Sequence, residues 1–181
     1  MDVLKALGER RSVRKFDPSQ QVAEEIVQEL LDAARLAPSW QNLQCWRFIV
    51  IRDQEKKKQL AESLHEGNPA VKAMEDAPIV IMVCGDPESS GKIDGKEYYL
   101  LDAGLALQQL MLAAHARGLG TCWVAWFDEP KARAACKVPE EYKIVAMTPL
   151  GFPAKEPKPR PRMEVGEIVY QDEWGKPYTD S

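Results

Sequence analysis

The chain has 181 residues, 45% of them hydrophobic and 29% charged, which is the composition of an ordinary globular protein. Its net charge of −4 argues against a general nucleic-acid or membrane-surface role. Four cysteines lie far apart without a Cys-x-x-Cys pair, and no signal-peptide pattern follows Met1. We therefore expect a single domain in a reducing cytoplasm, with neither disulfides nor a metal site.

The first predicted element is a short helix over residues 2–9, which leads into a strongly basic segment. Residues 10–16 contain four cations and a hydroxyl within a few positions. If this segment is extended, alternation places Arg10, Ser12 and Arg14 on one side. Arginine binds phosphate through a planar pair of donors, so this side is a candidate anion clamp. A solvated basic loop explains the same residues, and the segment alone favours that reading.

A loop rich in amides and hydroxyls follows the next predicted helix. Hydrophobic residues at helical spacing predict that helix over residues 22–36, and Pro38 ends it. Amides in residues 38–46 both donate and accept, so they suit the edge of a heteroaromatic ring, and Trp40 would supply flat apolar surface beside it. The plainer interpretation is a turn whose tryptophans fill the core. We favour that interpretation for Trp46, which begins a strand predicted over residues 46–51.

The middle of the chain is organised around one helix that is apolar on nearly every side. It covers residues 98–117 and follows a surface helix at 53–65, a loop or irregular helix at 67–76, a buried strand at 78–84 and a polar loop at 85–95. A helix that is apolar all round has to be covered all round. We therefore predict a core helix that is also a dimer seam.

The last third of the chain predicts two strands, a short helix and an extended arm. The strands cover residues 119–127 and 142–150, with a helix at 128–136 between them. Residues 153–162 hold four prolines and four cations, so they cannot form a helix and predict a stiff basic arm. The tail from 163 to 181 is expected to lie on a surface, anchored by Ile168, Val169, Tyr170 and Trp174.

The order of these motifs resembles the nitroreductase family of flavoproteins. The resemblance rests on Arg10-Arg11-Ser12-Val13-Arg14-Lys15-Phe16, Ala37-Pro38-Ser39-x-x-Asn42-x-Gln44-x-Trp46, Asp102-Ala103-Gly104, Gly118-Leu119-Gly120-Thr121, Leu150-Gly151-Phe152-Pro153 and Arg162. It implies an α+β fold, a three-layer sandwich with a central mixed β-sheet, in a homodimer whose arm, about residues 153–181, extends over the partner. The alternation of strands and helices by itself predicts a doubly wound parallel α/β sheet, which we keep as the alternative.

The resemblance also implies an FMN site at the dimer interface. Arg10, Ser12 and Arg14 would hold the phosphate and ribityl end, joined by Arg162, while Ser39 and Asn42 would reach the ring edge from the other subunit. Backbone groups of residues 124–126 would face flavin N5. The full predicted cofactor-binding set is Arg10, Arg11, Ser12, Arg14, Pro38, Ser39, Trp40, Asn42, Gln44, Trp123, Val124, Ala125, Trp126, Arg160 and Arg162.

Three positions depart from the family pattern. The family often has small residues where this chain has Trp40 and Gln41, so we predict that both contact substrate, and that Trp40 narrows the pocket or stacks on an aromatic acceptor. The family often has proline where this chain has Cys45. We interpret Cys45 as a packing residue, because little nearby would lower its pKa.

The implied activity is that of an FMN-dependent NAD(P)H oxidoreductase. NADH or NADPH would reduce the flavin, and a nitroaromatic, quinone or related small acceptor would then take two electrons in a ping-pong cycle. Open alternatives are a flavin-binding or regulatory protein without fast turnover, and a specialised member that dehalogenates, destroys flavin or dehydrogenates a peptide-like substrate. Because a buried phosphate needs paired cations, the basic segment and the arm are expected to converge, which favours a binding site over a solvated loop.

Overall fold

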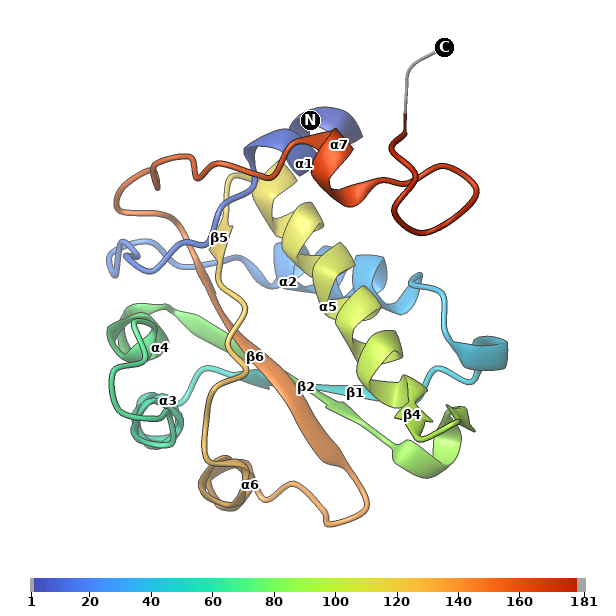
Figure 1. Cartoon of the computed structure of the whole chain (residues 1–181). Coiled ribbons are helices and arrows are strands. Elements are labelled where there is room, and N and C mark those ends of the chain that lie inside the picture. Colours follow the sequence, from blue (N-terminus) through green and yellow to red (C-terminus); the bar gives the residue numbers. More distant parts are fainter. Residues whose placement is uncertain (1, 179–181) are drawn as a thin grey trace.

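In the computed structural model, which describes residues 2–178, helices cover both sides of a four-stranded sheet (Figure 1). The strands, in their spatial order, are β1 (Trp46–Ile51), β2 (Ile79–Gly85), β6 (Lys143–Gly151) and β5 (Gly120–Thr121). Every neighbouring pair is antiparallel. A two-stranded hairpin, β3 (Lys92–Ile93) with β4 (Lys96–Glu97), stands apart from this sheet.

The doubly wound parallel sheet predicted from the alternation of elements is therefore wrong. The α+β class is confirmed, but the sheet is antiparallel where the resemblance implied a mixed one. Among residues 2–178, parallel pairing is confined to one isolated bridge between Ser12 and Thr121. The alternation of strands and helices predicted parallel strands wrongly, because two helices, α3 (Gln54–Glu62) and α4 (Val71–Asp76), and not one, connect β1 to β2. The second helix brings the chain back to the end at which β1 stops, so β2 runs in the opposite direction.

Four of the remaining helices lie close to their predicted positions: α1 (Val3–Glu9), α2 (Glu24–Arg35), α5 (Tyr98–Ala116) and α6 (Glu129–Cys136). The short helix α7 (Val165–Ile168) lies in the predicted tail, where no helix was expected, and the 3-10 turns η1 (Trp40–Asn42) and η2 (Pro87–Ser89) lie in predicted loops. The strand predicted over residues 119–127 is mostly absent. After Thr121 only isolated bridges remain, between Val124 and Met147 and between Phe127 and Leu64. An irregular segment of this kind leaves backbone groups available for another role.

Two hydrophobic clusters make the structure three-layered. On one side of the sheet, α2 and α5 pack Leu30 and Leu110 against the strands. On the other side, α3, α4 and α6 surround Met74 and Met147, which are fully buried. Figure 1 shows these two groups of helices on opposite sides of β2 and β6. The expected sandwich architecture is thus present in the single chain.

Helix α5 is covered on only part of its surface by its own chain. Ala103, Ala106 and Leu107 are fully buried, whereas Leu100 and Leu101 are 49% and 54% exposed. The prediction of cover on every side is therefore not met within one chain. Within the described part of the chain, no helix, α5 included, combines the length and apolar character that crossing a bilayer requires.

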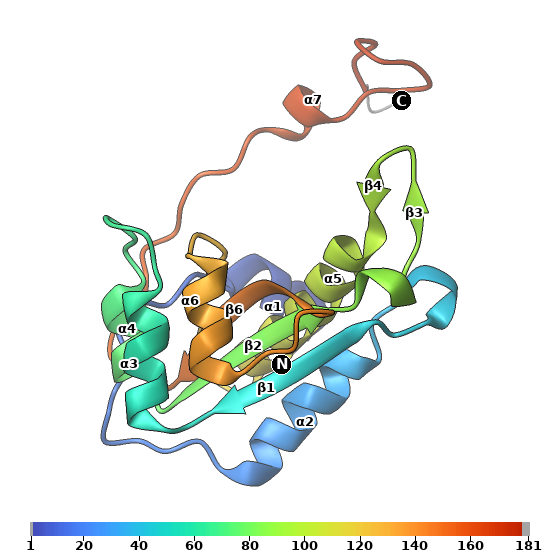
Figure 2. The same ribbon diagram turned by 90° about the horizontal axis from the view of Figure 1, so that it is seen from below.

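The arm is tied to the body at its root and then leaves it. Asp17 N–H donates to Phe152 O at 2.9 Å, and Ala154 N–H donates to Lys15 O at 3.0 Å. Beyond this point the arm projects away and carries α7 far from the sheet (Figure 2). The predicted anchoring is wrong for the chain's own surface, because Ile168 and Trp174 remain 58% and 90% exposed. Residues 179–181, the end of the predicted arm, lie outside the described residues.

Candidate functional site

The basic segment is held against the edge strand of the sheet. Val13 N–H donates to Thr121 O at 2.8 Å, next to the bridge between Ser12 and Thr121. This approach requires a residue without a side chain at position 120, because a Cβ there would lie 2.7 Å from Val13 Cβ. Gly120 therefore sets the position of the segment that carries Arg10 and Arg14.

The same segment continues alongside the root of the arm. Phe16 is buried and forms an antiparallel bridge with Pro153, flanked by the two hydrogen bonds of Asp17 and Lys15. Residues near both ends of the sequence thus run side by side. The arrangement explains how cations so distant in sequence reach one place: the backbone pairing delivers them there.

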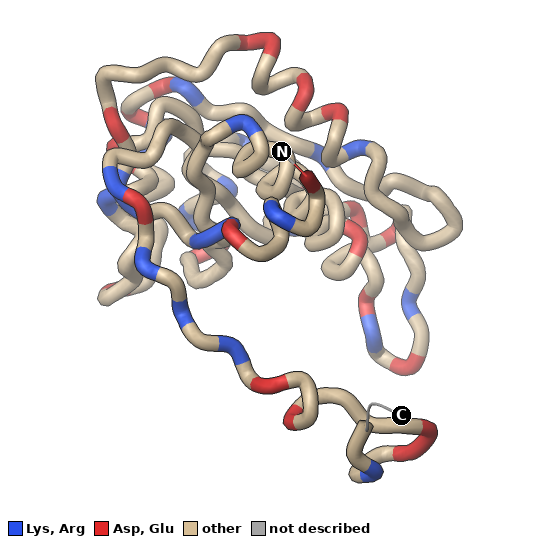
Figure 3. Tube along the Cα trace, turned by 90° about the horizontal axis from the view of Figure 1, so that it is seen from above, with Lys and Arg blue, Asp and Glu red and all other residues tan. Residues whose placement is uncertain are grey.

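These two segments enclose a pocket of about 760 Å³, which we call the basic pocket. Its lining residues are Arg10, Arg11, Ser12, Arg14, Pro157, Lys158, Pro159, Arg160, Pro161 and Arg162. The lining contains six cations and no carboxylate. None of these cations is in an ion pair with another of the described residues. Figure 3 shows basic residues following one another along the arm where it leaves the body.

The electrostatics of the basic pocket favour an anion. Burial, and then the positive charges of Arg11 and Arg162, lower the pKa of Arg10 below its ordinary value. Like charges that share a pocket repel one another, and an anionic ligand relieves this repulsion. Arg11 Nη1 donates hydrogen bonds to Gly8 O at 2.7 Å and to Arg10 O at 2.8 Å. Guanidinium donors with the Ser12 hydroxyl are a donor set that suits a phosphate monoester, such as that of FMN.

The predicted ring-edge residues lie elsewhere, in a loop over residues 38–45 that we call the ring-edge loop. Gln41, Asn42 and Gln44 have φ angles of 46°, 59° and 51°, in the left-handed region that favours glycine. Such conformations cost roughly 1 kcal/mol or more each and persist where the surroundings impose them. Gln44 N–H donates to Ser39 Oγ, and Gln44 Nε2 donates to Asn42 O. The side chains of residues 41–44 are exposed.

A buried carboxylate holds this loop on α5. Asp102 is 3% exposed, and its Oδ1 accepts from Trp40 N–H at 3.0 Å. Its Oδ2 accepts from Ser90 Oγ at 2.8 Å and from Cys45 Sγ at 3.6 Å. Burial, followed by the charge of Asp102, raises the pKa of Cys45 to about 11. The Cys45 thiol therefore stays protonated at neutral pH, as suits a packing residue rather than a nucleophile.

Part of the Trp40 ring packs against residues of its own chain. Its ring lies 4.7 Å from that of Tyr98, centroid to centroid, and covers Gly91 so closely that a Cβ there would lie 2.3 Å from Trp40. Trp40 is half-buried, while Pro38 and Gln41 are exposed. The substrate contacts predicted for Trp40 and Gln41 remain predictions. Any such contact involves the part of the Trp40 ring that Tyr98 and Gly91 leave free.

The third predicted segment, residues 123–126, follows β5 as irregular backbone. Val124 exchanges both of its hydrogen bonds with Met147, at 2.9 and 2.8 Å. Its N–H is therefore already engaged, which leaves the neighbouring backbone groups as candidates for a flavin contact. Trp126 O accepts from Asn68 Nδ2 at 2.9 Å. The side chains of Trp123 and Trp126 are 40% and 55% exposed, and Ala125 is exposed too.

The structure brings only part of the predicted set together. Arg10, Arg11, Ser12, Arg14, Arg160 and Arg162 line one pocket. The ring-edge loop packs on the N-terminal part of α5, whereas α1 and the basic segment lie near its C-terminal part. Sequence reasoning missed Lys158, although its alternation with Arg160 and Arg162 was visible. It also gave no site role to Asp102, a lone carboxylate in an apolar helix.

Comparison with known proteins places the chain in a family. The Nitroreductase family matches residues 7–152. A protein of Methanothermobacter thermautotrophicus, provisionally named an NADH dehydrogenase/NAD(P)H nitroreductase, is 35% identical over 96% of this chain and 88% of its own length. A 5,6-dimethylbenzimidazole synthase of Rhodospirillum rubrum is 34% identical over 86% of this chain and 83% of its own length.

Solved structures agree with this placement. A nitroreductase family protein of Clostridium novyi NT has a TM-score of 0.83 at 34% identity, and the match covers 98% of this chain and 97% of that one. A protein of Exiguobacterium sibiricum solved in complex with FMN has a TM-score of 0.83 at 25% identity, with 94% and 97% covered. The family match over most of the chain and the shared fold lead to one conclusion: this chain belongs to the Nitroreductase family, whose members are oxidoreductases.

Proposed function

We propose that this protein is an FMN-dependent NAD(P)H oxidoreductase that reduces nitroaromatic, quinone or related small acceptors by a ping-pong, two-electron cycle. The observation that carries the proposal is the basic pocket, where Arg10 and Arg14 meet Arg160 and Arg162. The family and the FMN-bound relative support the same cofactor. The name of the Methanothermobacter relative supports NADH or NADPH as the electron donor.

The charge of the basic pocket gives a physical reason for this cofactor. A phosphate monoester carries about two negative charges at neutral pH, and removing them from water is costly without paired cations. Arg14 and Arg162, from opposite segments, would grip the phosphate, and the Ser12 hydroxyl would add a neutral donor. The basic segment and the arm would thereby be held together by one ligand.

The ring end of the cofactor would lie toward the ring-edge loop of a second subunit. About 20 Å of helix separates Asp102, which holds that loop, from His115, which lies beside the basic segment. A homodimer in which α5 packs against its copy would bury Leu100 and Leu101 and place Ser39 and Asn42 of one chain near the basic pocket of the other. The arm, which leaves its own body, would lie over the partner.

In this proposal the protein binds and orients, while the redox chemistry is the cofactor's. FMN, when bound, supplies two-electron transfer from a nicotinamide donor to an acceptor. The cations of the basic pocket hold the phosphate, and amides of Asn42 and Gln44 would meet the alternating donors and acceptors of the ring edge. Donor and acceptor would use the same open face in turn, which is the basis of ping-pong kinetics.

Anaerobic rapid mixing tests the proposal. The purified, flavin-loaded protein is mixed with NADH or NADPH, and bleaching of the flavin absorbance is followed. Nitroaromatics and quinones are then added in turn. We expect rapid bleaching by at least one nucleotide and rapid recolouring by at least one acceptor. Very slow bleaching by both nucleotides would instead indicate a flavin-binding or regulatory protein without fast turnover.

A second candidate activity is the synthesis of 5,6-dimethylbenzimidazole. The 34% identity to a synthase of this compound favours it, and the dimethylated benzene ring of the product also occurs in the isoalloxazine of FMN. Aerobic incubation of the protein with excess FMN and NADPH, followed by chromatography and mass spectrometry, tests it. Accumulation of 5,6-dimethylbenzimidazole would establish this activity, and its absence beside fast acceptor reduction would leave the oxidoreductase.

A further inference from the structure

The carboxylate of Asp102 holds the ring-edge loop at both ends of its strained part. Oδ1 accepts from the backbone of Trp40, just before residue 41, and Oδ2 accepts from the side chain of Cys45, just after residue 44. Between these two points Gln41, Asn42 and Gln44 all have left-handed backbone angles. A four-residue segment with three such angles needs fixed ends, because non-glycine residues otherwise relax to other conformations.

The same carboxylate connects the loop to a second surface segment. Ser90 Oγ donates to Oδ2 at 2.8 Å, just before the hairpin of β3 and β4, and the adjacent Gly91 lies under the Trp40 ring. Gly91 O accepts from Tyr98 N–H at 2.9 Å, which ties this segment to the start of α5. Three parts of the chain, all outside the basic pocket, thus meet at one side chain that is 3% exposed.

The side chains that Asp102 fixes in place face outward. Residues 41–44 are exposed, although the backbone that carries them is anchored to a buried group. A loop that only filled the core would turn its side chains inward. An anchored backbone with outward amides is what a contact to another molecule requires.

We propose that Asp102 is a positioning residue: it clamps residues 40 and 45 so that Asn42 and Gln44 are presented to the flavin ring edge. This inference rests on the proposed function, in which that ring belongs to FMN held by the partner's basic pocket. Asp102 itself does not touch the cofactor. Its effect is carried by the conformation of residues 41–44, and this predicts that its contribution becomes smaller when Asn42 cannot make its contact.

The test is a double-mutant cycle read by binding. FMN affinity of the apoprotein is measured from quenching of flavin fluorescence for the wild type, Asp102→Ala, Asn42→Ala and the double variant. Losing the buried acceptor is expected to weaken FMN binding about tenfold. In the Asn42→Ala background the same change is expected to add a smaller loss than in the wild type, because coupled residues are not additive. Additive effects, or wild-type affinity in Asp102→Ala, would overturn the proposal.

Conservative variants keep the test decisive if Asp102→Ala fails to fold. Asp102→Asn retains an oxygen for Trp40 N–H, and Ser90 can turn its hydroxyl to accept from the new amide, so partial rescue of FMN affinity is expected. Ser90→Ala removes one donor and is expected to weaken binding less. If both bind FMN as tightly as the wild type, the positioning role is wrong.

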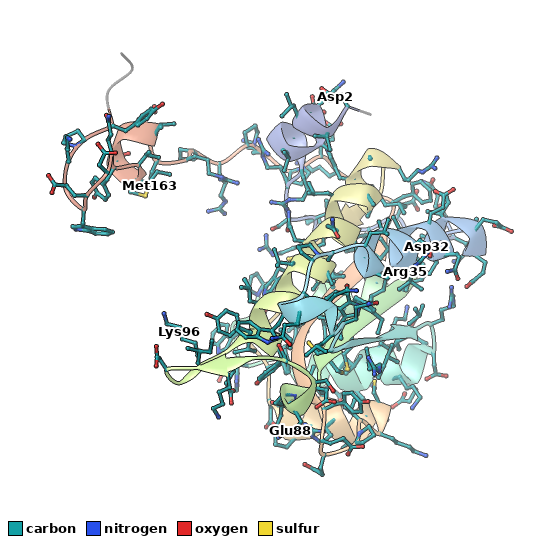
Figure 4. The ribbon with its side chains drawn as sticks, turned by 90° about the vertical axis from the view of Figure 1, so that its right-hand side faces the viewer. Asp2, Asp32, Arg35, Glu88, Lys96 and Met163 are labelled. Atoms are coloured by element: carbon teal, nitrogen blue, oxygen red, sulfur yellow. The ribbon has the colours of Figure 1, made fainter. Side chains whose placement is uncertain are left out.

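Matched controls separate this inference from the proposed function. Asp32→Asn changes an exposed carboxylate that is bonded to Arg35 on the surface of α2 (Figure 4) and should leave FMN affinity unchanged. If the wild-type apoprotein does not bind FMN, the proposed function fails, whatever Asp102 does. If Asn42→Ala and Gln44→Ala both bind FMN normally while Asp102→Ala does not, Asp102 acts by another route and the inference is overturned.

Discussion

The basic pocket and the ring-edge loop are built in opposite ways. The pocket joins residues 10–14 to residues 157–162, and its cations have no acidic partners among the described residues. The loop is one contiguous stretch, held by hydrogen bonds to Ser39 and Asn42 within it and to Asp102 on α5. The pocket is therefore unbalanced in charge, whereas the loop carries no charged side chain but is strained in its backbone. The basic pocket would be stabilised by the negative charge of a ligand, whereas the ring-edge loop presents a fixed backbone conformation.

This difference predicts which changes each region tolerates. Removing cations from the pocket should affect ligand binding far more than folding, because the free pocket gains nothing from their mutual repulsion. Removing a hydrogen bond that holds the ring-edge loop should change the conformation of that loop before it changes the rest of the fold. The loop and pocket of one chain lie near opposite parts of α5, so each test also bears on whether the two regions act on one cofactor.

The largest effect is expected from the double variant Arg14→Ala/Arg162→Ala. Each charge-assisted hydrogen bond to phosphate is worth about 1.5–3 kcal/mol, so each single change should weaken FMN binding about 10- to 100-fold, and the pair more. Fluorescence titration of the apoprotein measures this, with melting temperature as the check on folding. Lys96→Ala, at the hairpin (Figure 4), is the matched control, because it removes a cation outside the pocket. Full flavin content in the double variant would refute the phosphate assignment.

The next largest effect concerns the proposed sharing of sites between two chains. Leu101→Glu places a charge on the exposed side of α5 and, by symmetry, twice in a dimer. Burial of each leucine is worth about 1.5–3 kcal/mol, so light scattering should report a monomer that has also lost FMN. Leu36→Glu, at a leucine after α2 that is 70% exposed against 54% for Leu101, should remain dimeric and retain FMN. A wild-type monomer with full flavin would remove the shared-site picture.

A smaller effect is expected where the basic segment meets β5. Gly120→Ala would force a Cβ to within 2.7 Å of Val13 Cβ, and overpacking of this kind costs about 1–3 kcal/mol. Urea unfolding should show that loss, and FMN affinity should fall as Arg10 and Arg14 shift with the segment. Gly166→Ala, where an added Cβ meets nothing within 4 Å, should change neither. Unchanged FMN binding in Gly120→Ala would show that the exact position of the basic segment on β5 does not matter for FMN binding.

The smallest effect is a pH dependence at His115, beside the basic segment. Burial lowers the pKa of His115 below its ordinary value of 6.5, so the unfolded chain takes up a proton there at higher pH than the folded chain does. The stability that neutral His115 contributes is therefore present above the ordinary pKa and is lost as the pH falls from that value through the lowered pKa of the folded state. His115→Gln should flatten this part of the stability profile in urea titrations. An unchanged slope would show that His115 does not cause it.

Much of the local structure was predictable from residue patterns. The strand expected at 46–51 is β1, and those expected at 78–84 and 142–150 differ from β2 and β6 by about one residue. The strand expected at 119–127 failed after Thr121, because apolar β-branched and aromatic residues favour extended backbone whether or not a neighbouring strand pairs with it. The basic segment and the basic arm were each visible, and so was the reason for them to converge.

By itself, the sequence determined most of the helices, the long strands and the charges that need an anionic partner, because these follow from side-chain periodicity and from the cost of burying unpaired ions. Tertiary structure alone decided the direction of the strands, the pairing of residues 12–17 with 121 and 152–154, and the carboxylate of Asp102 under the ring-edge loop. These depend on contacts between residues far apart in the chain. No local pattern encodes such contacts, because each residue type there also fits an ordinary loop or core position.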